Sequence, residues 1–173
     1  MKPIVSKNSR IRLPRHFSIG NYSIVDDFCY FSTKIEIGRC CHIASGCLVG
    51  GGKDYLFRLG DFSSVSAGVK IWCQSNDYVN DAIIIVPAHI NVDSCALKGD
   101  VIIGEMCGIG SNAVIMPDNV IPEGVAIGAI SYVPPRFKFK PWYVYAGIPI
   151  KPILPRNKKN VIKQIEKIKR ALR

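Results

Sequence analysis

Large apolar residues recur at every sixth position along most of this 173-residue chain. The series begins at Ile19, is displaced by four residues after Val49, breaks after Ile71 and ends at Val133. A period of six fits neither the 3.6-residue turn of an α-helix nor the two-residue alternation of a simple strand. It fits short strands that turn a corner after each repeat, so that three repeats close one triangular coil. The sixteen positions of this column are Ile19, Val25, Phe31, Ile37, Ile43, Val49, Leu59, Val65, Ile71, Leu97, Ile103, Ile109, Ile115, Ile121, Ile127 and Val133.

A second column of small residues supports the coils, because the position four residues after each repeat start points inward where space is tighter. Coils of this kind stack at strand spacing, roughly 4.8 Å, and bury their apolar faces only against one another. We therefore predict an all-β fold, a parallel β-helix of about five coils. Four of the seven cysteines then fill the core as small hydrophobes. The small positions include Ser23, Cys29, Cys41, Cys47, Ser63, Cys107, Ala113 and Ser131.

Two insertions interrupt the repeat. The short one, at residues 50–58, begins with three consecutive glycines, and the long one runs from about Trp72 to Ala96. Insertions into a solenoid form loops that often lie on a binding face, and long loops on a rigid scaffold concentrate function. The long loop, residues 72–96, is therefore the first place to look for a site.

The chain changes character after the coils. A proline- and aromatic-rich stretch follows Val133, and the last residues predict an α-helix with Val161, Ile165, Ile168 and Leu172 on one stripe. We expect this stripe to pack on the coils or on a neighbouring subunit. The predicted organisation is one β-helix domain over residues 1–150, with the loop inserted, and a basic helical tail over residues 151–173.

The net charge of +10 belongs mostly to this tail, since nine basic residues and one acidic residue follow from Lys151 onward. A basic tail suits a membrane surface, nucleic acid or phosphorylated ligands, but it is more often a solvated helix face. We expect no nucleic-acid partner and at most a peripheral contact with a membrane. No apolar run reaches the roughly 20 residues of a membrane span, and the N-terminus lacks a signal-like apolar core. A cytoplasmic protein with reduced thiols and without a bound metal follows, since no Cys/His spacing indicates zinc.

Two C-terminal segments carry a resemblance to a known family. IIGEMCGIGSNAVIMPDNVIPEGVAIGAISYV resembles paired IGxxxxIGxxxxI repeats that end in IGAxSxV, and PWYVYAGIPIKPILPR resembles a closing AGxPAKxIxxR segment. With the repeat, they make almost the whole chain similar to the hexapeptide-repeat, left-handed β-helix acyltransferase superfamily. The PW-YAG-P form and the SNDY loop look most like its sugar O-/N-acetyltransferase branch in bacterial surface-glycan biosynthesis.

This resemblance implies acetyl-CoA as co-substrate and a homotrimer with active sites between subunits. The acceptor would be a sugar hydroxyl or a sugar amine, free or nucleotide-linked. Exposed backbone N–H groups polarise a thioester carbonyl, and lysine and arginine suit the coenzyme's phosphates. The resemblance places the thioester contacts at Gly110, Ser111, Gly128 and Ala129, and the phosphate contacts at Lys151 and Arg156.

The chain departs from the family at the catalytic base. Where a motif such as SHDY would stand, residues 75–78 read Ser-Asn-Asp-Tyr. Asn76 cannot accept a proton as a base, although it can position an acceptor. Asp77 could replace the histidine if desolvation raised its pKa, His89 could fold back from later in the loop, and His42 could face a neighbour's loop. A last option needs no base, because a deprotonated amine attacks a thioester more readily than a hydroxyl does, and it favours an aminosugar.

We therefore predict an acetyltransferase acting on a sugar, with Asn76, Asp77 and His89 as candidate catalytic residues. Two other functions stay open. One is an antibiotic acetyltransferase of the same fold, and the other is a non-catalytic trimeric β-helix that binds a ligand or scaffolds partners. The missing histidine favours the scaffold, whereas the intact closing segment favours an enzyme.

Overall fold

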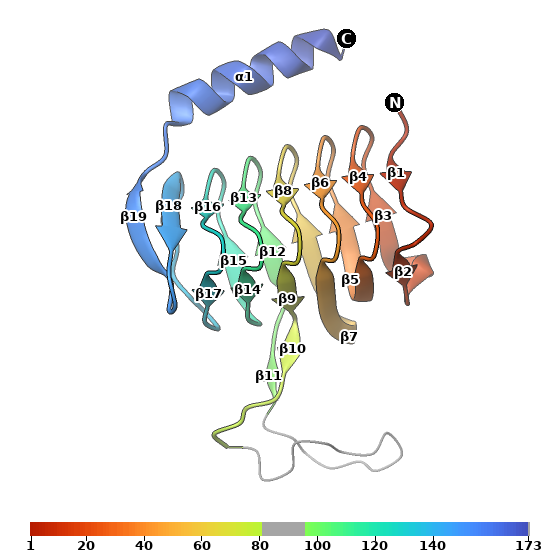
Figure 1. Ribbon diagram of the computed structural model, residues 1–173, viewed down its shortest axis with the longest axis vertical. Coiled ribbons are helices and arrows are strands. Elements are labelled where there is room, and N and C mark those ends of the chain that lie inside the picture. The colour runs from red at the N-terminus through yellow and green to blue at the C-terminus, as the bar shows by residue number, and fades with distance from the viewer. Residues whose placement is uncertain (81–95, 173) are drawn as a thin grey trace.

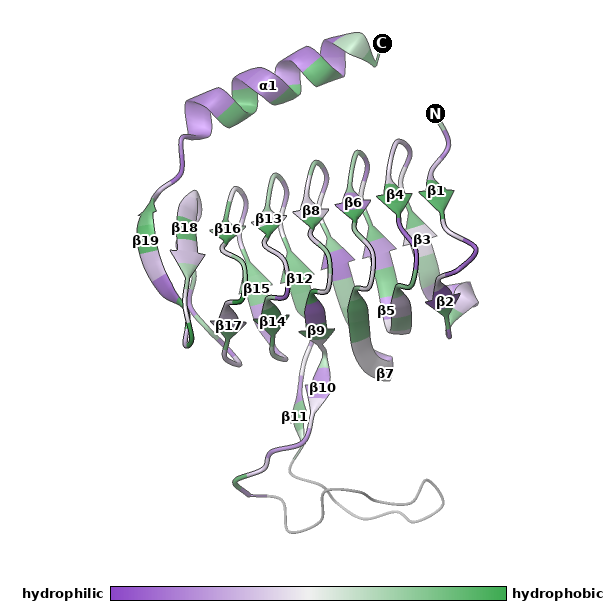
Figure 2. Cartoon of the chain, viewed as in Figure 1, coloured by the Kyte–Doolittle hydropathy of each residue, from purple (hydrophilic) through white to green (hydrophobic). Residues whose placement is uncertain are grey.

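The structure, a computed structural model, describes residues 1–80 and 96–172. The chain winds into a left-handed parallel β-helix and ends in one α-helix (Figure 1). The apolar repeat accounts for this shape, and strands in every coil carry apolar residues (Figure 2). The predicted fold is confirmed.

Three faces make up the coils. The first face stacks parallel strands in the order β1 (Ile4–Val5), β4 (Ile24–Val25), β6 (His42–Ile43), β8 (Ser64–Val65), β13 (Gly108–Ile109), β16 (Ala126–Ile127) and β18 (Tyr143–Ala146), and β19 (Lys151–Pro155) adds antiparallel to β18. The second face contains β3 (Phe17–Ile19), the C-terminal halves of β5 (Tyr30–Ile37) and β7 (Leu48–Leu59), β12 (Val101–Ile103) and β15 (Asn119–Ile121). The third face contains β2 (Arg10–Ile11), the N-terminal halves of β5 and β7, β9 (Lys70–Trp72), β14 (Val114–Ile115) and β17 (Tyr132–Val133). A 3-10 turn, η1 (Pro14–His16), precedes β3.

The β-helix has about six coils, one more than the repeat predicts. The coils continue past both ends of the regular repeat, where the spacing or the residue type changes. At the start, β1 and β2 precede Ile19 and are out of step with it. At the end, the buried position after Val133 is taken by the aromatic ring of Tyr145, which is 2 % exposed.

The inward column is buried as predicted at fourteen of its sixteen positions. Ile19 is half-buried in the first coil. Leu97 is also half-buried, and it does not belong to the column, because β11 (Leu97–Lys98) pairs with β10 (Gln74–Ser75) outside the coils. All eight small positions are at most 3 % exposed, and burial raises the pKa of the Cys107 thiol to about 11. Cys107 is therefore a packing residue. Cys29 is buried in the same column, although its hydrogen bond with Cys47 lowers the pKa of its thiol to about 7.

The repeated glycines serve close stacking of coils rather than a special backbone conformation. A Cβ at Gly60 would lie 2.6 Å from the backbone nitrogen of Glu105 in the next coil. The left-handed backbone conformation falls two residues after these glycines at the same corners, for example at Phe62 and at Ile130, both with φ 57°.

The two insertions take different forms. Residues 50–58 are not a loop but part of β7, which pairs with β5 along a widened corner where Thr33 Oγ1 donates to the carbonyl of Tyr55. The long insertion leaves after β9 as a two-stranded arm of β10 and β11, which projects away from the coils on the side opposite the helix (Figure 1).

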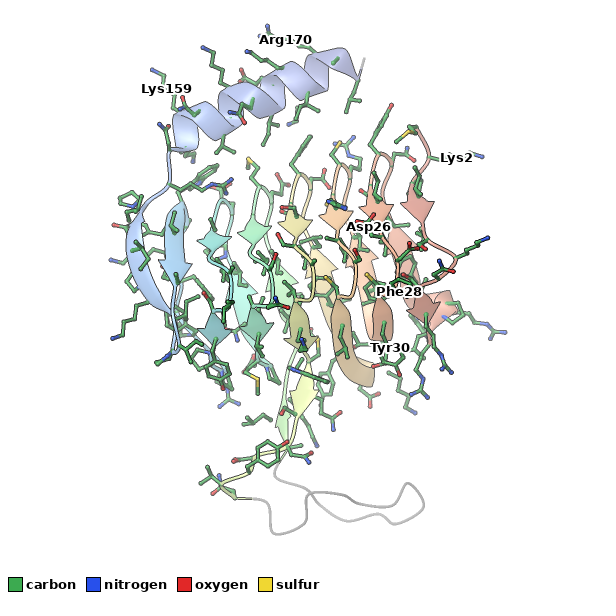
Figure 3. The ribbon with its side chains drawn as sticks, viewed as in Figure 1. Lys2, Asp26, Phe28, Tyr30, Lys159 and Arg170 are labelled. Atoms are coloured by element: carbon green, nitrogen blue, oxygen red, sulfur yellow. The ribbon has the colours of Figure 1, made fainter. Side chains whose placement is uncertain are left out.

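The helix α1 (Lys158–Ala171) runs back over one row of corners between the second and first faces (Figure 1). Asn157 caps it by accepting a hydrogen bond from the N–H of Asn160 at 3.1 Å. Of the predicted apolar stripe, Ile165 is buried against the coils, and Lys159 and Arg170 point away from them (Figure 3). Within the described residues, no helix is long and apolar enough to cross a membrane.

Candidate functional site

Four of the predicted coenzyme residues meet at one corner between the first and third faces. The strands β13 and β16 pair in register, with Ile109 opposite Ile127. The chain leaves both strands at the same height, so Gly110 and Ser111 lie beside Gly128 and Ala129. We call these four residues the glycine corner.

The backbone N–H groups of the glycine corner divide into two kinds. The N–H of Gly110 donates to the carbonyl of Ile127 at 2.7 Å, and that of Gly128 donates to Tyr145 at 2.8 Å. In the described part of the chain, the N–H groups of Ser111 and Ala129 make no such bond. Two donors, one coil apart, are therefore available at this corner to a carbonyl oxygen.

The absence of a side chain at Gly110 keeps one of these donors open. A Cβ built on Gly110 would lie 2.4 Å from the backbone nitrogen of Ala129. A Cβ on Gly128 would meet the Cβ of Ala146 at 2.9 Å. Both glycines are required by stacking, and Gly110 also leaves the approach to Ala129 clear.

The two predicted phosphate contacts lie apart. Lys151 is exposed in β19, opposite Ala146 at the end of the first face. Arg156 is half-buried at the other edge of this face, where its Nη1 donates to the carbonyls of Met106 and, at 3.0 Å, of Gly124. The guanidinium thus joins the segment before α1 to two coils, a role that its place in the sequence did not indicate.

Asn76 and Asp77 directly follow β10, where the paired strands of the arm end. Asp77 accepts hydrogen bonds from the side chain of Asn80 at 2.6 Å and from the N–H of Val79 at 3.0 Å. These bonds, the one from Asn80 first, lower the pKa of the Asp77 carboxyl below its ordinary value. Within one chain Asp77 is a carboxylate at neutral pH, whereas the hypothesis of a base required a raised pKa. His89 lies outside the described residues.

The arm and the glycine corner lie at opposite edges of the third face. The arm continues from the end of β9, while the glycine corner leads into the start of β14, the neighbour of β9. A single chain therefore does not bring Asp77 to the N–H groups of Ser111 and Ala129.

The first face carries a histidine–aspartate pair, of which the sequence analysis identified only the histidine. His42 Nε2 lies 2.8 Å from Asp26 Oδ2, and both side chains are exposed. Sequence reasoning considered His42 but missed Asp26, which precedes it by nearly one coil and is labelled in Figure 3. Among residues 1–80 and 96–172, no group of three or more His, Cys, Asp and Glu side chains could hold a metal ion.

Known proteins resemble this chain over most of its length, although no protein-family model matches it. The dTDP-4-amino-4,6-dideoxy-D-glucose acyltransferase of Escherichia coli is 36 % identical over 152 residues, which are 83 % of this chain and 74 % of the relative. A probable macrolide acetyltransferase of Lysinibacillus sphaericus is 29 % identical over 103 residues, 54 % of this chain and 56 % of the relative.

A solved structure extends the match to nearly the whole chain. AntD, an N-acyltransferase from Bacillus cereus in complex with dTDP and 3-hydroxybutyryl-CoA, superposes with a TM-score of 0.86 and 32 % identity, covering 98 % of this chain and 89 % of AntD. The coils, the closing segment and these relatives agree. The chain belongs to the hexapeptide-repeat sugar acyltransferases, enzymes that take an acyl group from coenzyme A.

Proposed function

We propose that this enzyme N-acylates a dTDP-linked aminosugar with an acyl-CoA donor. The observation that carries the proposal is the match to two dTDP-sugar enzymes, the Escherichia coli acyltransferase and AntD, over 83 % and 98 % of the chain. Asn76 in the place of a histidine agrees with it, because an amine that has lost its proton needs no protein base to attack a thioester.

The glycine corner supplies electrostatic stabilisation. As the acceptor nitrogen bonds to the thioester carbon, negative charge develops on the carbonyl oxygen. The C–S bond then breaks, and the departing thiolate takes up the proton that the nitrogen loses. The N–H groups of Ser111 and Ala129 would donate to this oxygen. Removing one such donor typically costs about 10²–10³ in turnover, so the pair has the right chemistry for the step.

Asp77 would hold the acceptor rather than take its proton. Its lowered pKa keeps it charged, and a carboxylate beside an ammonium favours the charged amine. Asn76 would contribute hydrogen bonds to the sugar. His89 remains the candidate base if the acceptor is a hydroxyl.

The residues present also suit the coenzyme. Bound acyl-CoA would supply an activated thioester, and the small side chains of the glycine corner leave room for it. The exposed ammonium of Lys151 suits a phosphate. Arg156 carries five donors, so its guanidinium can bind a phosphate in addition to its two carbonyl partners.

The separation of arm and glycine corner supports a trimer. If neighbouring chains pack side by side, the arm of one can reach the glycine corner of the next, and the site is complete only at the subunit boundary. We further propose that this trimer acts in the cytoplasm, on a precursor of a surface polysaccharide.

The test compares two acceptors that differ only at the acylated position. Purified enzyme receives acetyl-CoA with dTDP-4-amino-4,6-dideoxyglucose, or with the same nucleotide sugar carrying a hydroxyl at that carbon. Thiol release and the product mass are measured. We expect acylation of the amine alone, with a rate that rises as the amine deprotonates. Acylation of the hydroxyl alone would refute the proposal.

An antibiotic acetyltransferase is the second candidate, favoured by the 29 % identity to the macrolide enzyme. Its match covers only 54 % of the chain. The same assay with a macrolide acceptor separates the two functions. Faster turnover of the macrolide than of the dTDP-aminosugar would favour the antibiotic acetyltransferase. A scaffold without activity predicts no thiol release with any acceptor.

A further inference from the structure

Two isoleucines stand out from the coils beside the glycine corner. Ile130 is 65 % exposed and Ile148 is 70 % exposed. The strands β16 and β18 pair with Ile127 opposite Tyr145, and Ile148 lies in the turn that follows β18, where the chain reverses into β19 instead of continuing the corner. They form an apolar step next to Ala129.

Ile130 breaks two rules of local structure at once. Its φ of 57° lies in the left-handed region, which β-branched residues strongly disfavour. Earlier coils place Phe28, Gly46, Gly68 and Asn112 at this point of the same corner. None of these four is β-branched, and glycine and asparagine tolerate the conformation. An exposed side chain gains little from burial that could offset the strain. The fold of this chain alone does not explain an isoleucine here.

The groups around this step indicate what it contacts. The N–H of Ala129 precedes Ile130 directly, and the N–H of Ser111 lies one coil away, both without a backbone acceptor among the described residues. Two polar donors beside an apolar wall match a carbonyl that carries a short hydrocarbon chain. The acyl thioester of the donor has this chemistry.

We infer that Ile130 and Ile148 form the wall against which the acyl chain of the donor lies, and that they set the acyl length that the enzyme prefers. The inference rests on the proposed role of the glycine corner in acyl transfer. Each methylene buried on such a wall favours the longer donor, by roughly three- to fourfold in affinity. The wall is thus a specificity determinant rather than part of the chemistry.

The experiment measures kcat/KM for acetyl-CoA and for butyryl-CoA with one acceptor, in the wild type and in Ile130→Asn. The expected result is a fall of about tenfold in the butyryl-to-acetyl ratio, as for two methylenes that lose their wall. The unfolding midpoint should rise, because asparagine relieves the left-handed strain, and the mass by light scattering should not change. Ile148→Ala should lower the ratio in the same direction.

Phe28→Asn is the matched control. Phe28 lies at the same corner four coils away, with φ 62° and 73 % exposure, and is labelled in Figure 3. Its replacement should raise the unfolding midpoint and leave the ratio unchanged. An unchanged ratio in Ile130→Asn, an equal change in Phe28→Asn, or dissociation of the oligomer in Ile130→Asn would overturn the inference, the last by showing that a second copy of the chain covers the step.

Failure of the proposed function is distinguishable from failure of this inference. The ratio compares acyl donors, so it is measured with whichever acceptor the enzyme turns over, amine, hydroxyl or macrolide. If the enzyme does not acylate the dTDP-aminosugar, but Ile130→Asn still lowers the butyryl-to-acetyl ratio with another acceptor, the proposed function is refuted and the inference about the acyl wall is supported.

Discussion

Two glycines near β13 differ in how closely the next coil packs against them: Gly108 lies in the strand, and Gly110 directly follows it. A Cβ at Gly110 would press on the nitrogen of Ala129 at 2.4 Å, whereas a Cβ at Gly108 would meet nothing within 4 Å. Gly110 is therefore required both by stacking and by the candidate site, whereas Gly108, two residues earlier, is required by neither.

We predict that Gly110→Ala cuts kcat by about 10²-fold, because the added methyl group shields the Ala129 N–H from the thioester oxygen. It should also destabilise the protein by about 1–3 kcal/mol through overpacking. Steady-state kinetics and thermal unfolding measure the two effects. Gly108→Ala is the control, and it should be neutral or stabilising by about 0.5–1 kcal/mol. Full activity in a folded Gly110→Ala would remove the Ala129 N–H from the mechanism.

Asp77 tests the choice between an orienting group and a base. Since its pKa is already lowered by Asn80 and Val79, Asp77→Asn should raise the KM of the acceptor, by about tenfold for one lost charged hydrogen bond. The carboxylate favours the protonated amine, so its removal should move the acid limb of the rate profile to lower pH. A loss of kcat by about 10²–10⁴-fold at unchanged KM would instead identify a base.

At the scale of elements, α1 is held to the coils mainly near its N-terminus. Arg156 bonds to two carbonyls of the coils, and Lys158 lies 4.9 Å from the centroid of the Trp142 ring and 3.6 Å from Glu123 Oε1. Farther along, Lys169 Nζ lies 5.4 Å from the centroid of the Phe62 ring, and cavities of about 360 Å³ and about 240 Å³ lie between the helix and the corner row of Cys40 and Phe62. The attachment of the helix therefore depends on few contacts.

We predict that Arg156→Ala lowers the free energy of unfolding by about 2 kcal/mol, because two coil carbonyls lose a charged donor. The midpoint should fall by about 4–8 °C for a chain of this length. If the guanidinium also binds a coenzyme phosphate, the KM for acyl-CoA should rise while kcat is spared. Lys151→Ala is the matched variant. Its side chain is exposed, so a higher KM at unchanged stability is expected.

Glu123 links the attachment of α1 to pH. The hydrogen bond from Trp142 Nε1, at 2.9 Å, is the main cause that lowers the pKa of this carboxyl from its ordinary value of 4.5, with Lys158 adding to it. A lowered folded-state pKa adds stability that is complete above pH 4.5 and is lost as the pH falls through the folded value. The effect is small, since the Glu123 side chain is 49 % exposed.

We expect acidification from pH 6 to pH 3 to lower the protection of the α1 amides, taken relative to the intrinsic exchange rate at each pH, before the coils open. Glu123→Gln should remove part of this acid response. Hydrogen exchange along residues 157–172, measured by mass spectrometry in both proteins, tests this prediction. Equal acid response in the wild type and in Glu123→Gln would show that other groups hold the helix at low pH.

At the scale of the whole molecule, the chain builds two parts of a site and keeps them apart. The arm leaves one edge of the third face and the glycine corner occupies the other. The exposed apolar side chains of Ile153 and Leu154 in β19, 56 % and 52 % exposed, add a surface that one chain leaves uncovered. Closed assemblies are the usual way to cover such surfaces.

We predict that light scattering at micromolar protein gives three times the chain mass of 19.1 kDa. Mixing a Gly110→Ala chain, which has a low kcat, with an Asp77→Ala chain, which has a raised acceptor KM, should then restore part of the activity at low acceptor concentration, because some boundaries receive one intact half from each chain. A monomeric mass would contradict the trimer, and a trimer without restored activity would place both halves of the site in one chain.

Local spacing determined the fold of this protein. An inward position recurs every six residues. The burial of Ile103, Ile109 and Ile115, which are at most 1 % exposed, could therefore be predicted from their spacing alone, before any contact was known. The same holds for the small column and for the existence of the arm, since an insertion is visible as a break in the period. The glycine corner followed from the family motif on the same repeats, and the structure brings its four residues together.

The tertiary structure alone decided what those groups do. The bonds from Arg156 to Met106 join residues 50 positions apart, the pair of His42 and Asp26 spans 16, and the short insertion became part of β7 through its pairing with β5. The carbonyl of Ile127, in the next coil, accepts the hydrogen bond from the N–H of Gly110. The N–H of Ser111 is therefore the one left for a ligand. The physical reason is that a hydrogen-bond partner in a solenoid lies about one coil away in the chain, and residues inserted into a coil change which groups meet.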